Sequence, residues 1–185
     1  MLTLRAFGAL DLRDARGEPV EAVLAQAKRA ALLVYLLLSR PGGFHRRDSL
    51  VAMFWPETDA EHARGSLRKA LSFLRHELEE GIVLTRGGEE VGVDPSRVDC
   101  DVLAFGDAVA REDWEGALEL YRGDLLEGLH VREAPEVADW VDRERVRLRE
   151  AAAGAAWRWA HQLIGEGKLV EAERKAQRAL QLVPT

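Results

Sequence analysis

Three arginines, a lysine and a serine recur at helical spacing in the segment FWPETDAEHARGSLRKALSFLR. On a helix with about 100° per residue, Arg68 and Arg75 lie within roughly 40° of Arg64, with Ser72 at roughly 80° and Lys69 at roughly 140°. The apolar residues of the segment centre at roughly 290°, so the cations face away from the expected core. Arginine can donate two hydrogen bonds to guanine, and lysine and serine can reach bases or phosphates. The pattern therefore predicts a helix that binds nucleic acid.

A plain solvent-facing surface is the alternative explanation for these cations. An amphipathic helix must place polar residues on its wet side, and arginine is a good helix former. Glu61, Glu77 and Glu79 could pair with the arginines. The elements expected on either side of the helix, a shorter helix before it and a hairpin after it, favour the nucleic-acid interpretation.

Composition limits where such a helix could act. The formal net charge is −6, whereas residues 40–75 hold seven Lys/Arg and four Asp/Glu, a local excess of +3. A single cysteine, Cys100, excludes an internal disulfide and suits a reducing compartment. The N-terminus lacks a signal-peptide layout, and the longest apolar run, residues 30–38, is too short to span a bilayer. These features predict a cytoplasmic protein with no membrane association.

The first hundred residues contain both strand and helix patterns. They predict one or two short strands within 2–12, a helix from about 25 to 40, a helix at 45–55, a long helix at 59–80 and a hairpin at 82–93. Thr58 and Glu61 have the spacing of a capping box at the start of the long helix. The order of helix, helix, long helix and hairpin is that of a winged helix-turn-helix, and it places Arg86 at the hairpin tip.

The second half of the sequence is expected to be entirely helical. Helices are predicted at 101–111, 114–121, 135–164 and 168–182, with Pro184 after the last of them. DWEGALELY and KLVEAERKA share a spacing of bulky and small residues that is typical of helix-pair repeats. Three tryptophans of the long helix are expected in the core: Trp140, Trp157 and Trp159.

Taken together, the motifs MFWPETDAEHARGSLRKALSFLR and LTLRAFGALDL…QAKRAALLVYLLLSRPGG resemble the winged-helix domain of SARP-type bacterial transcriptional regulators. The later stretch from LYRGDLLEGL to the end resembles their bacterial transcriptional activator domain. The resemblance implies an OmpR/PhoB-type DNA-binding domain at 1–98, with an N-terminal β-sheet and a C-terminal hairpin. A tetratricopeptide-like all-α domain would follow at 99–185, and the abrupt end at Thr185 predicts a piece of a longer protein.

For the site, the resemblance implies a transcriptional activator that reads promoter DNA with a recognition helix at 59–80. The expected partners are double-stranded DNA, RNA polymerase and a second protomer. The candidate DNA-binding residues are Arg64, Arg68, Lys69, Ser72, Arg75, Arg86, Arg46 and Arg47. The candidate polymerase-contact loop holds Trp55, Glu57, Thr58 and Asp59. Glu89 and Glu90, beside Arg86, are expected to repel phosphates.

Other chemistry has little support in the sequence. The five histidines show no metal-ligand spacing, Cys100 has no neighbouring Cys or His and is expected to be inert or part of a linker, and RGGEEVG lacks the lysine of a phosphate loop. We therefore expect no enzyme activity, no cofactor and no metal. The competing hypothesis is a protein-interaction scaffold within a larger signalling protein, with weak or no DNA binding.

Overall fold

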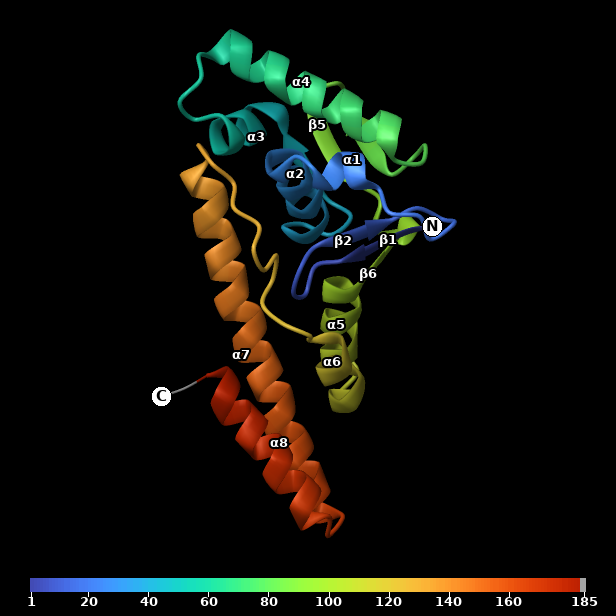
Figure 1. The fold of residues 1–185 in the computed structure, drawn as a ribbon, viewed down its shortest axis with the longest axis vertical. Coiled ribbons are helices and arrows are strands. Elements are labelled where there is room, and N and C mark those ends of the chain that lie inside the picture. The colour runs from blue at the N-terminus through green and yellow to red at the C-terminus, as the bar shows by residue number, and fades with distance from the viewer. Residues whose placement is uncertain (184–185) are drawn as a thin grey trace.

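The chain forms a mixed structure of helices and two small sheets, drawn out along one axis (Figure 1). It is a computed structural model that describes residues 1–183, so Pro184, expected after the last helix, lies outside the described residues. Helix α4 (Ala60–Glu77) lies at one end of the long axis. The turn between α7 (Pro135–Gly165) and α8 (Leu169–Leu182) lies at the other end.

The first sheet joins the start of the chain to residues near position 100. Its strand order is β2 (Asp11–Arg13), β1 (Leu2–Arg5) and β6 (Val98–Cys100), with β1 antiparallel to β2 and parallel to β6. Leu4 points into the core, as period-two alternation requires. Cys100 is a buried residue of β6, so it does not belong to a linker. Sequence patterning did not predict β6 because three residues are too few to show alternation.

Three helices and a short strand precede the long helix. Helix α2 (Ala27–Leu38) occupies the region of the first predicted helix, and seven of its residues are buried. Helix α1 (Glu21–Leu24) lies before that region and was not predicted. Helix α3 (Arg47–Phe54) begins two residues later than predicted. The delay arises because β3 (Phe44–Arg46) precedes it and pairs with the hairpin that follows α4.

The predicted hairpin is confirmed. Strands β4 (Val83–Arg86) and β5 (Glu90–Val93) pair antiparallel, and β3 completes a sheet of order β3-β5-β4. Gly87 and Gly88 turn the chain with φ angles of +59° and +75°, which side chains with a Cβ rarely adopt. At Gly92 an added Cβ would lie 2.5 Å from the carbonyl oxygen of Gly43, so β3 and β5 can approach only because that side chain is missing.

Beyond residue 100 the structure contains two pairs of helices. They are α5 (Asp101–Ala110) with α6 (Trp114–Leu120), and α7 with α8; α7 also packs against α6. Trp140 of α7 is buried and meets the ring of Tyr35 in α2 edge-on, with centroids 5.0 Å apart. Trp159 is half-buried, but Trp157 is 42% exposed, so the core prediction is wrong for Trp157. Two residues along a helix turn through about 200°, so both side chains cannot face the core.

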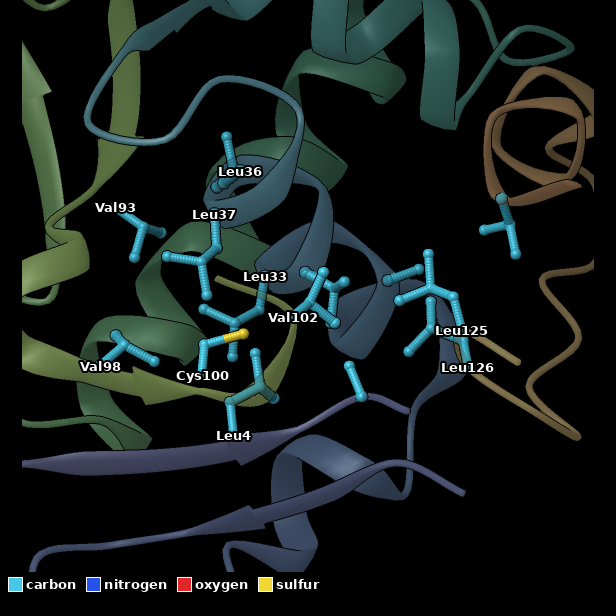
Figure 2. Close-up of a cluster of buried hydrophobic side chains, with 14 of the residues drawn as sticks. Leu4, Leu33, Leu36, Leu37, Val93, Val98, Cys100, Val102, Leu125 and Leu126 are labelled. Atoms are coloured by element: carbon cyan, nitrogen blue, oxygen red, sulfur yellow. The ribbon is translucent and has the colours of Figure 1, made fainter. Parts of the chain in front are cut away.

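The sheet region and the helical region are joined by backbone hydrogen bonds and a shared core. Residues 6–8 exchange three backbone hydrogen bonds of 2.8 Å with residues 124–127. The buried carboxylate of Asp101 accepts the backbone N–H groups of Ala6 and Phe7 at 2.9 and 3.1 Å. Apolar side chains from both regions form one continuous cluster (Figure 2), including Leu4, Leu33, Leu37, Val102, Leu125 and Leu126. The position of α4 relative to α7 is therefore set by packing.

Candidate nucleic-acid interface

Helix α4 carries most of the predicted site residues, and its burial pattern sets which way they face. The buried residues are Ala63, Leu67, Ala70, Leu71 and Leu74. The opposite sides of the helix carry the exposed residues Arg64, Arg68, Lys69, Ser72 and Arg75. The five polar side chains are therefore accessible to a ligand and do not take part in the core.

The start of α4 differs from the predicted capping box. Asp59 is the N-cap, and its carboxylate accepts the backbone N–H of His62 at 3.1 Å. The ring Nδ1 of His62 also lies 2.8 Å from that carboxylate. Thr58 and Glu61 therefore do not form the box, because the helix begins one residue later than their spacing requires. The hydrogen bonds from His62 lower the pKa of Asp59, which keeps the cap charged.

The start of α3 and the turn of the β4–β5 hairpin lie beside the arginine side of α4. The backbone N–H of Arg47 donates to the carbonyl of Glu89 at 2.9 Å, and its Nε donates to the carbonyl of Gly88 at 2.7 Å. Arg47, Arg64 and Arg68 line the same hollow of about 180 Å³. Arg47 thus connects the hairpin turn to the helices, in addition to contributing charge.

Two of the arginines here lie close to each other. The pKa of Arg75 is lowered, first by burial and then by the positive charge of Arg47. Like charges in proximity raise the free energy of the unliganded protein, and an anion placed between them lowers it. We call Arg47, Arg64, Arg68 and Arg75 the arginine flank of α4.

Acidic residues partly neutralise this flank. Asp48 pairs with Arg64 at 3.3 Å, and both side chains are more than 60% exposed. Outside the flank, on the hairpin, Glu90 pairs with Arg86 at 2.6 Å, and the Arg86 guanidinium also lies 4.6 Å from the ring centre of Phe44. Exposed pairs of this kind contribute little free energy, so a phosphate can replace the carboxylate partner at small cost.

The remaining predicted site residues lie at the edges of this surface. Arg46 is exposed at the end of β3, next to Arg47. Residues 55–59 form the loop that leads into α4, in which Glu57 and Thr58 are exposed. Trp55 is half-buried against Phe54, with ring centroids 5.9 Å apart. Trp55 thus anchors one end of the loop, and the middle of the loop is exposed to solvent.

Lys28 and Arg29 were missed as candidate site residues. They belong to the first turn of α2, yet they share a hollow with Lys69 on the other side of α4. The sequence did hold a signal, since QAKRAALLVYLLL places two adjacent cations at the start of an otherwise apolar helix. Without the packing of α2 against α4, nothing connected these cations to the helix at 59–80.

Groups that could support other chemistry are buried or dispersed. Burial raises the pKa of the Cys100 thiol to about 11, so the thiolate that would react is scarce at neutral pH. His45 is buried, contacts the hydroxyl of Ser39 at 3.1 Å, and has a pKa lowered first by burial and then by Arg40. Within residues 1–183, no three His, Cys, Asp or Glu side chains gather as metal ligands. In the same range, none of the helices combines the length and apolar character needed to cross a membrane.

Comparison with family models found none that matches this chain, and comparison with curated proteins also found no match.

Proposed function

We propose that this protein is a DNA-binding transcriptional activator of the SARP type, with α4 as its recognition helix. The observation that carries the proposal is the arginine flank, in which Arg64, Arg68 and Arg75 project to solvent from one side of α4 and Arg47 adds a fourth guanidinium from α3. An exposed helix with these side chains fits the major groove, where arginine bonds guanine and serine or lysine bonds phosphates.

The neighbouring elements support a winged helix-turn-helix interpretation. Helices α2, α3 and α4 precede the β4–β5 hairpin, which would serve as the wing. Arg86 lies at the end of β4 and would approach the phosphates beside the major groove. Its pair with Glu90 has to open for that contact, so we assign the wing a smaller share of the binding free energy than α4.

The rest of the chain would connect DNA binding to transcription. The exposed loop at 55–59 is the proposed contact with RNA polymerase, because it lies at the start of the DNA-reading helix. The α5–α6 and α7–α8 pairs are compatible with a tetratricopeptide-like domain that pairs two protomers or receives a signal.

The test is a fluorescence-anisotropy titration of labelled DNA duplexes that the protein itself has selected from a random-sequence library. We compare the wild type with an R64A/R68A variant and with an R111A/R174A control, which removes two exposed arginines far from α4. We expect the first variant to lose at least tenfold in affinity, and the control to bind like the wild type. Binding should weaken steeply as salt rises, because each engaged phosphate releases counterions.

Negligible binding by all three proteins, with helicity unchanged by circular dichroism, would exclude DNA binding. That outcome would favour the competing hypothesis of a protein-interaction scaffold.

A further inference from the structure

Helix α4 has a second cationic side, which lies about 100° around the helix from Arg68. The first turn of α2 packs beside α4 there, and residues of both helices line a hollow of about 210 Å³. Its polar lining includes Gln26, Lys28 and Arg29 from the start of α2 and Ser66 and Lys69 from α4. We call Lys28, Arg29 and Lys69 the lysine rim.

Aromatic rings hold two of these cations in place. The Nζ atom of Lys28 lies 5.7 Å from the ring centre of Trp55, and the guanidinium carbon of Arg29 lies 3.9 Å from that of Phe73. A ring face attracts a cation without removing its charge. These contacts favour the observed side-chain positions, which reduces the entropy that binding must overcome.

The lysine rim has no acidic counterpart. No Asp or Glu lines its hollow, and within residues 1–183 none of its three cations lies within 4.0 Å of a carboxylate oxygen. The hollow of the arginine flank, by contrast, includes Asp48 and Glu89. Three positive charges without a counterion, in a protein of net charge −6, mark a place where an anionic ligand lowers the electrostatic free energy.

The position of the lysine rim on α4 indicates which anionic ligand it would bind. Lys69 follows Arg68 directly in α4, so their side chains diverge by about 100° around the helix. A helix with its side chains is about 10–12 Å across, and the major groove is about 12 Å wide. A helix in the groove therefore turns its two sides toward the two sugar–phosphate backbones.

We propose that the lysine rim binds the DNA backbone on the side of the major groove opposite the arginine flank. The hydroxyl of Ser66 and the amide of Gln26 add hydrogen-bond donors for the phosphate oxygens. This inference rests on the proposed function, and it adds phosphate contacts made by cations outside the arginine flank. An acidic protein segment is the other class of ligand, and DNA is favoured because Lys69 belongs to the helix that carries the arginines.

The experiment compares salt dependence in a K28Q/K69Q variant, in the R64A/R68A variant and in an R111Q/R174Q control that removes the same charge elsewhere. Arg29 is left intact because its stacking on Phe73 supports the fold. The slope of log affinity against log salt should become shallower by about 2 in K28Q/K69Q, since each lost phosphate contact changes it by about 0.9. The loss of affinity should be equal on selected and random duplexes, because phosphate contacts carry no sequence information. The control should keep the wild-type slope.

Because Lys28 is half-buried, its replacement could disturb folding, so a K69Q variant is also measured. The slope of log affinity against log salt should become shallower by about 1 in K69Q. If wild-type protein binds DNA and R64A/R68A weakens it, while K28Q/K69Q and K69Q keep the wild-type slope, the lysine rim does not bind the backbone. That result overturns this inference, leaves the proposed function in place and points to an acidic protein partner for the rim. Absence of DNA binding by the wild type overturns both.

Discussion

Two helices of this protein are rich in arginine, and they use it in opposite ways. On α7, Arg145 donates to the backbone carbonyls of Leu125 and Leu126 at 2.8 and 2.9 Å, and Arg149 pairs with Asp124. Arg147 on the same helix pairs with Glu144 at 2.6 Å. On α4, the arginines are exposed, and their neighbours include other cations.

The difference shows that the presence of an arginine-rich helix in a sequence does not by itself predict what its arginines do. The surroundings of each guanidinium decide whether it stabilises the fold or remains available to a ligand. Residues 124–126 offer carbonyls and a carboxylate to α7, so its cations join the helix to the loop that pairs with residues 6–8. Within residues 1–183, neither Arg68 nor Arg75 forms an ion pair, although Asp48 and Glu89 line the hollow beside Arg68.

The first effect concerns stability, at Arg145. This side chain is 24% exposed and makes two hydrogen bonds to backbone carbonyls, which an R145A variant leaves without their donors. The free energy of unfolding should fall by about 2 kcal/mol, measured by urea denaturation. R68A is the matched variant on α4 and should change stability by less than about 0.5 kcal/mol. Equal losses of stability in the two variants would contradict the conclusion that α7 and α4 use arginine differently.

The second effect concerns DNA affinity, at Arg68. If this side chain bonds a guanine, R68A should weaken binding to a selected duplex by about 1–3 kcal/mol and relax the preference at one base position. R68K retains the charge but not the paired donors, so it should restore binding to random duplexes more than binding to selected ones. A base-by-base substitution series in the duplex, titrated by anisotropy, measures both. Full rescue by lysine on selected duplexes would show that Arg68 contacts only phosphate.

The sequence predicted the elements with long or distinctive patterns. The apolar stripe of α4 extends over five buried positions, and the paired glycines at 87–88 fixed the hairpin. Strands β3 and β6 were missed because each has three residues and owes its conformation to partners far away in the chain. Pairs such as Arg149 with Asp124 likewise depend on tertiary packing, whereas the pair of Arg147 with Glu144 follows from helical spacing.

The part of the candidate site that lies on one helix could be predicted from the sequence. The part that is formed by residues of two helices could not. Helical geometry alone placed Arg64, Arg68 and Arg75 on the exposed side of α4. Lys28 lies about forty residues earlier in the chain, and only the packing of α2 brings it to Lys69.

A third prediction tests Arg47, which combines the two uses of arginine. Its Nε bonds the carbonyl of Gly88, and its charge acts on Arg75. R47A should free the hairpin turn, so that amide hydrogen exchange at residues 86–90 accelerates, and should weaken DNA binding by about 1 kcal/mol. R47Q keeps a donor without the charge and should slow the exchange again without restoring affinity. Unchanged exchange in R47A would show that Arg47 acts through charge alone.

A fourth prediction concerns Arg64 of α4 and its acidic partner Asp48. Removing the Asp48 charge in a D48N variant frees Arg64 and should tighten DNA binding by up to about fivefold, which corresponds to the 0.2–1 kcal/mol typical of an exposed pair. The same change at Asp142, which pairs with Arg145 on α7 at 3.0 Å, is the control and should leave binding unchanged. Weaker binding by D48N would mean that Asp48 positions Arg64 for its contact.

The smallest expected effect is a difference in how the stability of two variants depends on pH, one at the contact of α7 with Asp124 and one on α4. Burial acts to raise the pKa of Asp124, but hydrogen bonds from Arg149 and Tyr121 and the charges of Arg149 and Arg145 outweigh it and lower the pKa. A carboxyl whose pKa is lowered in the folded state contributes stability above its unfolded pKa of about 3.9 and loses it as the pH falls through the folded value. Because the pair is about one-third exposed, that contribution should stay below about 1 kcal/mol. Urea midpoints at pH 7 and pH 3 should therefore differ less in D124N than in the wild type. R68A should keep the wild-type pH dependence, since Arg68 forms no ion pair within residues 1–183.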